Sequence, residues 1–399
     1  MSRRIMFVCR SATGEALRCA NAIRALEDVT LEICEAPLSN DVQQLVRAAK
    51  RGSVDRIVTA QETLLLVVAE ANEALGLEAM SSEVVKRTLD KATLKSTLRL
   101  AGIKTPRECL LTTAEDAREL GFPLVVKSLH GSGALTTFRI DDVEQLTRIL
   151  NLIDGPMIAE TCITGEELCC DTVTIANEPQ CYSVCCYDPP ILDALEDPTR
   201  QWRCVMPRDL TPYDDFIREG LAAVKALKVG NAITHMEGFM NAGFIDATLR
   251  PAGARIGPMF GYAFDVDPYR LWARVAVDGC FDGPLERKFA AGTIFLRGSG
   301  SGSVETVHGI ESIETELKHM IVEGCWPTVG ANKAQTYTGD GFVTVRHPET
   351  SVVHNALDFI DRTLKITYSS AAKLETPWTD RLRKFNELNR PAWDNITIN

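Results

Sequence analysis

The first 88 residues alternate between strand and helix patterns, and this alternation constrains the fold more than any other feature. An apolar run, Arg4–Cys9, predicts a buried strand, and a helical pattern over residues 16–26 follows a short polar turn. Two further strands, Thr30–Cys34 and Val54–Thr59, are each followed by a helical pattern. Because strands that alternate with helices pack as a parallel sheet, residues 1–88 are expected to form a small parallel α/β domain.

Composition places the chain among globular proteins of two or three domains. Its 399 residues are 45% hydrophobic and 24% charged, which suffices for several packed cores. With 43 Lys and Arg against 54 Asp and Glu, the net charge of −11 provides no general basic field for nucleic acid or an anionic membrane. No apolar run approaches the ~20 residues that span a bilayer, and the N-terminus lacks a signal-peptide pattern, so a cytoplasmic protein is expected.

The thirteen cysteines are many for a chain of this kind. Their number is odd, and no Cys-x-x-Cys pair occurs in the sequence. This usage indicates reduced, mostly buried thiols rather than a zinc or redox site.

A segment beyond the middle of the chain predicts a β-hairpin with one acid on each arm. Arms Ala232–Met240 and Gly243–Arg250, joined by two residues, would set Glu237 directly opposite Asp246. Two carboxylates at about 5 Å between Cα atoms repel unless a cation lies between them, and carboxylate oxygens suit Mg²⁺. The alternative is a solvated sheet face with a surface ion pair, and the spacing alone leaves both explanations open.

Two other segments offer parts of a nucleotide site. Lys127 ends an apolar strand beside the small-residue loop His130–Gly133, where backbone N–H groups could approach phosphate oxygens. The strand Met157–Glu160 breaks shortly before Glu166–Glu167, so its backbone could pair with a base edge and an acid could hold sugar hydroxyls. Taken singly, each segment is more typical of an ordinary turn.

The order of these motifs is more specific than any one of them. In chain order they are Asp90-Lys91, Val125-Val-Lys127 with its Gly/Ser loop, Ala159-Glu160, Gly165-Glu-Glu167, Thr234-His-Met-Glu237-Gly-Phe239 and Asp246-x-x-x-Arg250-Pro-x-Gly253. The succession resembles the ATP-grasp superfamily, and its last two motifs look like those of ligases that join amino acids or small carboxylates to amines.

The resemblance runs from about residue 4 to the 360s and implies a mixed α/β and α+β chain with the ATP-grasp fold. It implies four parts: a pre-ATP-grasp α/β domain (1–88), an ATP-grasp domain of two subdomains with the nucleotide between them (89–290), a C-terminal α/β portion (291–370) and a tail (371–399). Between residues 174 and 208 the pattern predicts loops, and substrate specificity is expected to depend on Cys181–Met206.

The resemblance also implies which residues hold the cofactors ATP and Mg²⁺. The residues implied to bind ATP are Lys91, Lys127, Ser132, Gly133, Glu160, Ile163 and Glu167. The implied ligands of one or two Mg²⁺ ions, for which Mn²⁺ can substitute, are Glu237, Asp246 and Thr248. Asp246 and Thr248 stand where the family usually has glutamate and asparagine, so a second ion would be held loosely or be absent.

Further residues are implied in catalysis and substrate binding. Arg250 matches the arginine that stabilises the transferred phosphoryl group, and Lys127 is its expected catalytic partner. His235 is expected to orient the neighbouring metal ligand. Arg255 and Arg297 could meet a substrate carboxylate, although a structural salt bridge is an equal alternative for Arg255.

The implied reaction activates a small carboxylate or amino acid as an acyl-phosphate, which an amine converts to an amide or dipeptide-like bond with release of ADP and phosphate. The alternatives are a carboxylase or other acyl-phosphate enzyme, and a non-catalytic nucleotide-binding module. The expected partners are small-molecule carboxylates and amines, without nucleic acid or membrane, and a homodimer is compatible with the resemblance.

Overall fold

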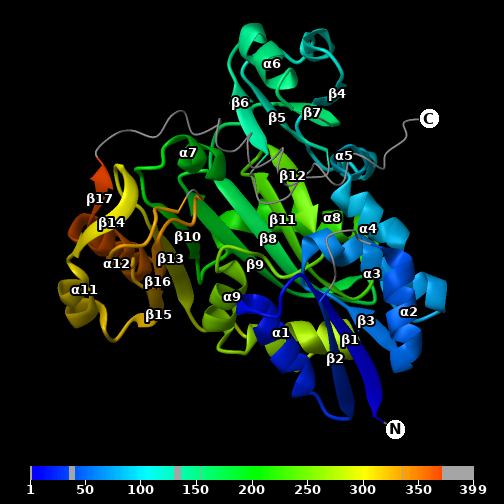
Figure 1. Ribbon diagram of the computed structural model, residues 1–399. Coiled ribbons are helices and arrows are strands. Elements are labelled where there is room, and N and C mark those ends of the chain that lie inside the picture. Colours follow the sequence, from blue (N-terminus) through cyan, green and yellow to red (C-terminus); the bar gives the residue numbers. More distant parts are fainter. Residues whose placement is uncertain (1, 36–40, 130–135, 154, 335, 371–399) are drawn as a thin grey trace.

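The computed structural model describes residues 2–35, 41–129, 136–153, 155–334 and 336–370. The loop with Ser132 and Gly133, and the tail from residue 371, lie outside the described residues, so their expected roles stay predictions. The described chain forms four sheets, of three, four, eight and two strands (Figure 1). Within these ranges, we find no helix with both the length and the apolar character needed to cross a membrane.

A parallel sheet of strand order β2-β1-β3 forms the N-terminal unit, as the alternation predicts. Its elements are β1 (Arg3–Cys9), α1 (Gly14–Arg24), β2 (Val29–Glu35), α2 (Val42–Gly52), β3 (Arg56–Val58) and α3 (Glu62–Leu75). Ile5 and Phe7 of β1 pack with α1, whereas Met6 and Val8 pack with α2 and α3. The strand is therefore covered on both faces, which explains its unbroken apolar run.

A small antiparallel sheet of order β4-β7-β5-β6 follows, and in Figure 1 it projects with α6 above the largest sheet. The elements of this part are α4 (Ser82–Leu89), α5 (Lys91–Leu100), β4 (Glu108–Leu111), the 3-10 turn Ala114–Ala117, β5 (Leu124–Ser128), β6 (Thr137–Ile140), α6 (Val143–Leu150) and β7 (Met157–Thr161). The Asp90 carboxylate accepts from Thr93 N at 2.6 Å and caps α5, so this helix begins at Lys91.

The largest sheet has the strand order β12-β11-β8-β9-β10-β13-β16-β15. Its strands are β8 (Glu167–Ile175), β9 (Glu178–Asp188), β10 (Trp202–Met206), β11 (Ala232–Phe239), β12 (Gly243–Thr248), β13 (Ala290–Leu296), β15 (Ile321–Cys325) and β16 (Gly341–His347). The prediction of loops between residues 174 and 208 is therefore wrong, since β9 and β10 lie in the middle of the sheet. Strands β13, β15 and β16, which begin at or after residue 290, belong to the same sheet as β8 to β12. The expected domain limits stay predictions.

Helices cover both faces of this sheet. The remaining elements are α7 (Ile191–Glu196), the 3-10 turn Thr211–Tyr213, α8 (Asp214–Leu227), α9 (Ile256–Phe264), α10 (Pro268–Ala273), the π-helical turn Arg274–Asp278, β14 (Ser301–His308), α11 (Ile310–Leu317), α12 (Thr350–Thr363) and β17 (Lys365–Ser370). Cys169 of β8 belongs to the core under α9, whereas Cys170 belongs to the core under α5 and α8. Neighbouring cysteines thus point to opposite faces, as alternation along a strand requires.

The hairpin of β11 and β12 has the predicted register. Glu237 lies opposite Asp246, and His235 lies opposite Thr248. The register shifts by one residue between Glu237 and Gly238, so only the part near the turn departs from the prediction. Gly243 follows the turn with φ of 96°, and a Cβ there would lie 2.1 Å from the carbonyl oxygen of Lys104.

Candidate active site

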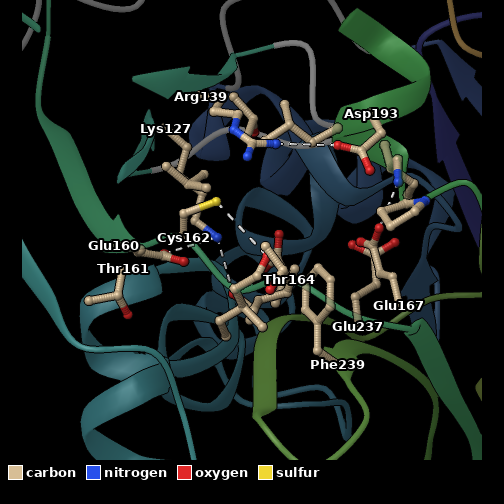
Figure 2. A pocket seen from close by; sticks show the side chains of 18 of the residues that line it. Lys127, Arg139, Glu160, Thr161, Cys162, Thr164, Glu167, Asp193, Glu237 and Phe239 are labelled. Atoms are coloured by element: carbon tan, nitrogen blue, oxygen red, sulfur yellow. Dashed lines mark hydrogen bonds and ion pairs between the residues drawn. The ribbon is translucent and has the colours of Figure 1, made fainter. Parts of the chain in front are cut away.

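A cavity of about 250 Å³ lies between the small sheet and the β11–β12 edge of the largest sheet (Figure 2). Its charged lining comprises Lys91, Lys127, Arg139, Glu160, Glu167, Asp193, Glu237 and Asp246, and its apolar lining includes Val125, Ile163, Ile191, Phe239 and Ile245. Arg139 of β6 and Asp193 of α7 approach to 3.5 Å across the cavity (Figure 2). Two separate sheets therefore supply opposite walls of this cavity.

Two lysines share one carboxylate beneath this cavity. Lys127 of β5 and Lys95 of α5 lie 2.9 and 2.6 Å from the same oxygen of Glu160 on β7. The Lys95 side chain is fully buried, and its ammonium also donates to the carbonyl oxygen of Ile245 at 3.1 Å. Lys95 was not identified from the sequence, although it lies one helical turn after Lys91 and hence on the same helix face.

Burial and charge act against each other in this group. Burial lowers the pKa of Lys95, Lys127 lowers it further, and the attraction of Glu160 leaves it at about 8. Burial also acts to lower the pKa of Lys127, but Glu160 and Asp246 raise it above its ordinary value. For Glu160, burial acts to raise the pKa and the two lysines lower it. The cavity therefore has a cationic floor, and the ammonium of Lys95 lies buried beneath it with a lowered pKa.

The hairpin carboxylates form the wall between this cavity and a second one, since Glu237 and Asp246 line both. Lys91 Nζ lies 3.2 Å from Asp246 Oδ2. Burial acts to raise the pKa of Asp246, but Lys91 and Lys127 hold it below its ordinary value. Thr248 Oγ1 is buried and has no hydrogen-bond partner among the described residues. Two carboxylates beside an unpaired hydroxyl fit a divalent cation and its bound water.

Glu167 lines the same cavity but makes a contact that the sequence does not indicate. Its Oε2 accepts a hydrogen bond from the backbone N of Ile191 at 2.6 Å. Burial, reinforced by the nearby charge of Glu237, raises the pKa of Glu167 to about 8. The group can therefore donate as well as accept at neutral pH, which suits hydroxyl groups of a ligand. Its role toward ribose stays a prediction.

The second cavity is smaller, about 70 Å³, and lies on the other side of the carboxylate pair. Its side chains are mainly aromatic or charged, namely Glu62, Tyr187, Trp202, His235, Glu237, Asp246, Arg250 and Tyr337. Arg250 Nη2 lies 2.7 Å from Glu62 Oε2, so helix α3 of the N-terminal unit contributes directly to this cavity. Neither Glu62 nor Tyr337 was identified from the sequence, because only the tertiary fold brings them here.

The other residues predicted to bind substrate differ in position. His235 lines the second cavity, where Asp171 raises its pKa well above the ordinary value although burial acts to lower it. Arg255 pairs with Glu323 and lies over the Phe342 ring at 4.6 Å, outside both cavities. Arg297 also lies outside them, and its guanidinium donates to the carbonyl oxygens of Ala194 and Arg200.

The arrangement of the sheets is the ATP-grasp fold, and comparison with solved structures confirms this fold. The L-amino acid ligase of Bacillus licheniformis superposes with a TM-score of 0.73 at 19% identity, over 92% of this chain and 99% of that one. The N5-carboxyaminoimidazole ribonucleotide synthetase of Thermotoga maritima gives 0.68 at 19% identity, over 92% and 100%. No family model matches the chain.

The sequence relatives of this chain carry the names of amino-acid ligases. The L-arginine-specific L-amino acid ligase of Bacillus subtilis is 25% identical over 206 residues, 48% of this chain and 49% of that protein. The alanine–anticapsin ligase of Bacillus subtilis is 25% identical over 268 residues, 59% and 57% of the two chains. A D-alanine–D-alanine ligase of Polynucleobacter asymbioticus is 34% identical over 127 residues, 30% and 38%. The chain is thus homologous to these ligases and spans about half the length of the first two.

Proposed function

We propose that this protein is an ATP-dependent ligase that joins a small carboxylate or amino acid to an amine. The observation that carries the proposal is the shared wall of Glu237 and Asp246, with a lysine-floored cavity on one side and a small cavity containing Arg250 on the other. Such a wall would hold a phosphate donor and a carboxylate acceptor on opposite sides of one metal site. We also propose that the protein acts in the cytoplasm.

The roles of the side chains follow from their charges. Lys91 and Lys127 would bind the phosphates, with Lys95 adding positive charge from beneath them, and Glu237, Asp246 and Thr248 would hold the divalent cation. Bound ATP with Mg²⁺ supplies the phosphoryl group that activates the carboxylate and converts its oxygen into a leaving group. Arg250 would leave Glu62 to hold oxygens of the substrate carboxylate and of the transferred phosphoryl group, since its planar guanidinium can bind two oxygens at once.

The size of the second cavity supports a small first substrate. Its volume of about 70 Å³ is far smaller than the 250 Å³ of the cavity that we propose holds the nucleotide. Its aromatic walls, Tyr187, Trp202 and Tyr337, favour a compact side chain over a long one.

A matrix of amino acids and small acids, each with and without an amine, tests the function by phosphate release and product mass. The proposal expects ADP formation that depends on both substrates and a product equal to their sum minus one water. ADP formation that requires bicarbonate instead would assign a carboxylase. ATP binding without turnover for any pair would leave a non-catalytic nucleotide-binding module.

Lys95 makes nucleotide affinity depend on pH. Because its pKa is about 8 and an anionic ligand favours the charged form, ADP affinity is expected to fall as pH rises above 8. Between pH 7 and pH 9 the ADP affinity should fall about tenfold, because the protonated fraction of a group with a pKa of about 8 falls by about this factor. Calorimetric titration with ADP at pH 7 to 9 measures it, with Lys95→Met as the control that should bind weakly without this dependence. An equally steep fall in Lys95→Met would exclude Lys95 as its source.

A further inference from the structure

A chain of buried polar groups runs through the largest sheet to Glu237. Asp171 of β8 and His235 of β11 are register partners, only 5% and 8% exposed. Asp171 Oδ1 lies 2.7 Å from His235 Nδ1, and the Cys169 thiol donates to its other oxygen at 3.4 Å. On the opposite edge of the ring, His235 Nε2 lies 3.3 Å from Glu237 Oε1. Both ring nitrogens and both oxygens of Asp171 are therefore engaged.

The two oxygens of Glu237 have unequal surroundings. Oε1 lies 3.3 Å from His235 Nε2 and accepts from the Tyr187 hydroxyl at 3.3 Å. Among the described residues, no hydrogen bond or ion pair reaches Oε2. The terminal torsion of a glutamate is broad and soft, so contacts that hold one oxygen also fix the direction of the other. Oε2 is the oxygen left for a ligand at the wall between the cavities.

We infer that Asp171 is a positioning residue that, through His235, holds Glu237 Oε1 and leaves Oε2 directed at the divalent cation. This rests on the proposed function, because Glu237 must bind metal for the arrangement to matter. Hydrogen bonds from outer groups orient metal ligands, and their loss typically lowers metal affinity about 10- to 100-fold. The competing explanation is that Asp171 only satisfies a buried histidine.

Mn²⁺ binding separates the two explanations without relying on turnover. Asp171→Asn keeps the side-chain volume but removes the charge beside His235, and it should weaken Mn²⁺ binding about tenfold, as measured by electron paramagnetic resonance at saturating ADP. ADP affinity without divalent metal should stay unchanged. Thr172→Val is the matched control, since Thr172 is the next buried residue of β8 and its hydroxyl contacts Thr174. It should alter neither affinity.

A double-variant cycle tests whether Asp171 acts through His235. His235→Asn can retain the contact to Asp171 but removes the nitrogen facing Glu237, so it should show the same Mn²⁺ defect. The double variant should bind Mn²⁺ no more weakly than His235→Asn alone. Should Asp171→Asn not fold, Asp171→Ser takes its place.

Wild-type Mn²⁺ affinity in the Asp171 variant, or defects that multiply in the double variant, would overturn the inference. Failure of the proposed function is seen in a different measurement, the substrate matrix, whereas a wild-type protein that binds no Mn²⁺ with ADP would remove the metal site on which the inference rests.

Discussion

Replacing Glu237 with glutamine is expected to lower the rate of ADP formation about a thousandfold, or about 4 kcal/mol of transition-state stabilisation. Glutamine keeps the size of the side chain and one oxygen, but it removes the charge that opposes Asp246 across the hairpin. The pair would no longer supply two anionic ligands at the shared wall. Divalent cation is therefore expected to bind weakly, and phosphoryl transfer loses the charge neutralisation on which it depends.

Initial rates across a Mg²⁺ titration measure this effect. Glu178→Gln is the matched control, because Glu178 is a carboxylate of the same sheet whose side chain is 62% exposed and paired with Lys225. It should retain the wild-type rate, whereas Asp246→Asn should lose activity as Glu237→Gln does. Wild-type rates in both hairpin variants would show that the metal does not bind at the hairpin.

The hairpin also shows what can be predicted from sequence. Its register follows from strand alternation and a short turn, so the pairing of Glu237 with Asp246 needs no tertiary information. The one-residue shift beyond Glu237 does need it, because Gly243 packs against the backbone of Lys104 in a different part of the fold. The register of the half that carries Glu237 and Asp246 thus follows from local geometry, whereas the register near the turn does not.

The central strands β9 and β10 could not be predicted for a different reason. β9 carries Pro179 near its start, and its cysteines, serine and tyrosines give neither a clean alternation nor a continuous aliphatic run. Its ladder with β8 and β10 covers it on both edges, and helices cover its faces. The signal for such a central strand therefore lies in the strands and helices that pack against it rather than in its own sequence pattern.

Lys95 and Asp171 were not identified from the sequence for a similar reason: their contacts are made by distant strands. Lys95 carries a local signal, its four-residue spacing from Lys91, but only Glu160 from a distant strand shows why both ammonium groups point inward. Asp171 looks like any polar residue of a strand until β11 brings His235 to 2.7 Å. The residues proposed to bind ligand directly carry motif signals, whereas the residues that contact them from behind do not.

Replacing Glu160 with alanine is expected to cost about 3–5 kcal/mol of unfolding free energy, because it leaves two buried ammonium groups without their carboxylate. Urea unfolding at pH 7 measures this loss. Glu115→Ala is the control in the same small unit, since its pair with Arg118 is 72% and 79% exposed and should contribute below about 1 kcal/mol. A loss as small as that of Glu115→Ala would mean that the lysines do not depend on Glu160.

The pH dependence of the unfolding free energy shows which of the two lysines causes the loss of stability in Glu160→Ala. The pKa of Lys95 is about 8 in the folded wild type, below its ordinary value, and should fall further once Glu160 is removed. The unfolded chain then binds more protons than the folded chain above that pKa, so the unfolding free energy of the variant should rise with pH. The deficit of Glu160→Ala should therefore shrink between pH 7 and 9. Lys95→Met combined with Glu160→Leu should remove only the part of the deficit, and of its pH dependence, that Lys95 causes, because Lys127 still lacks its carboxylate.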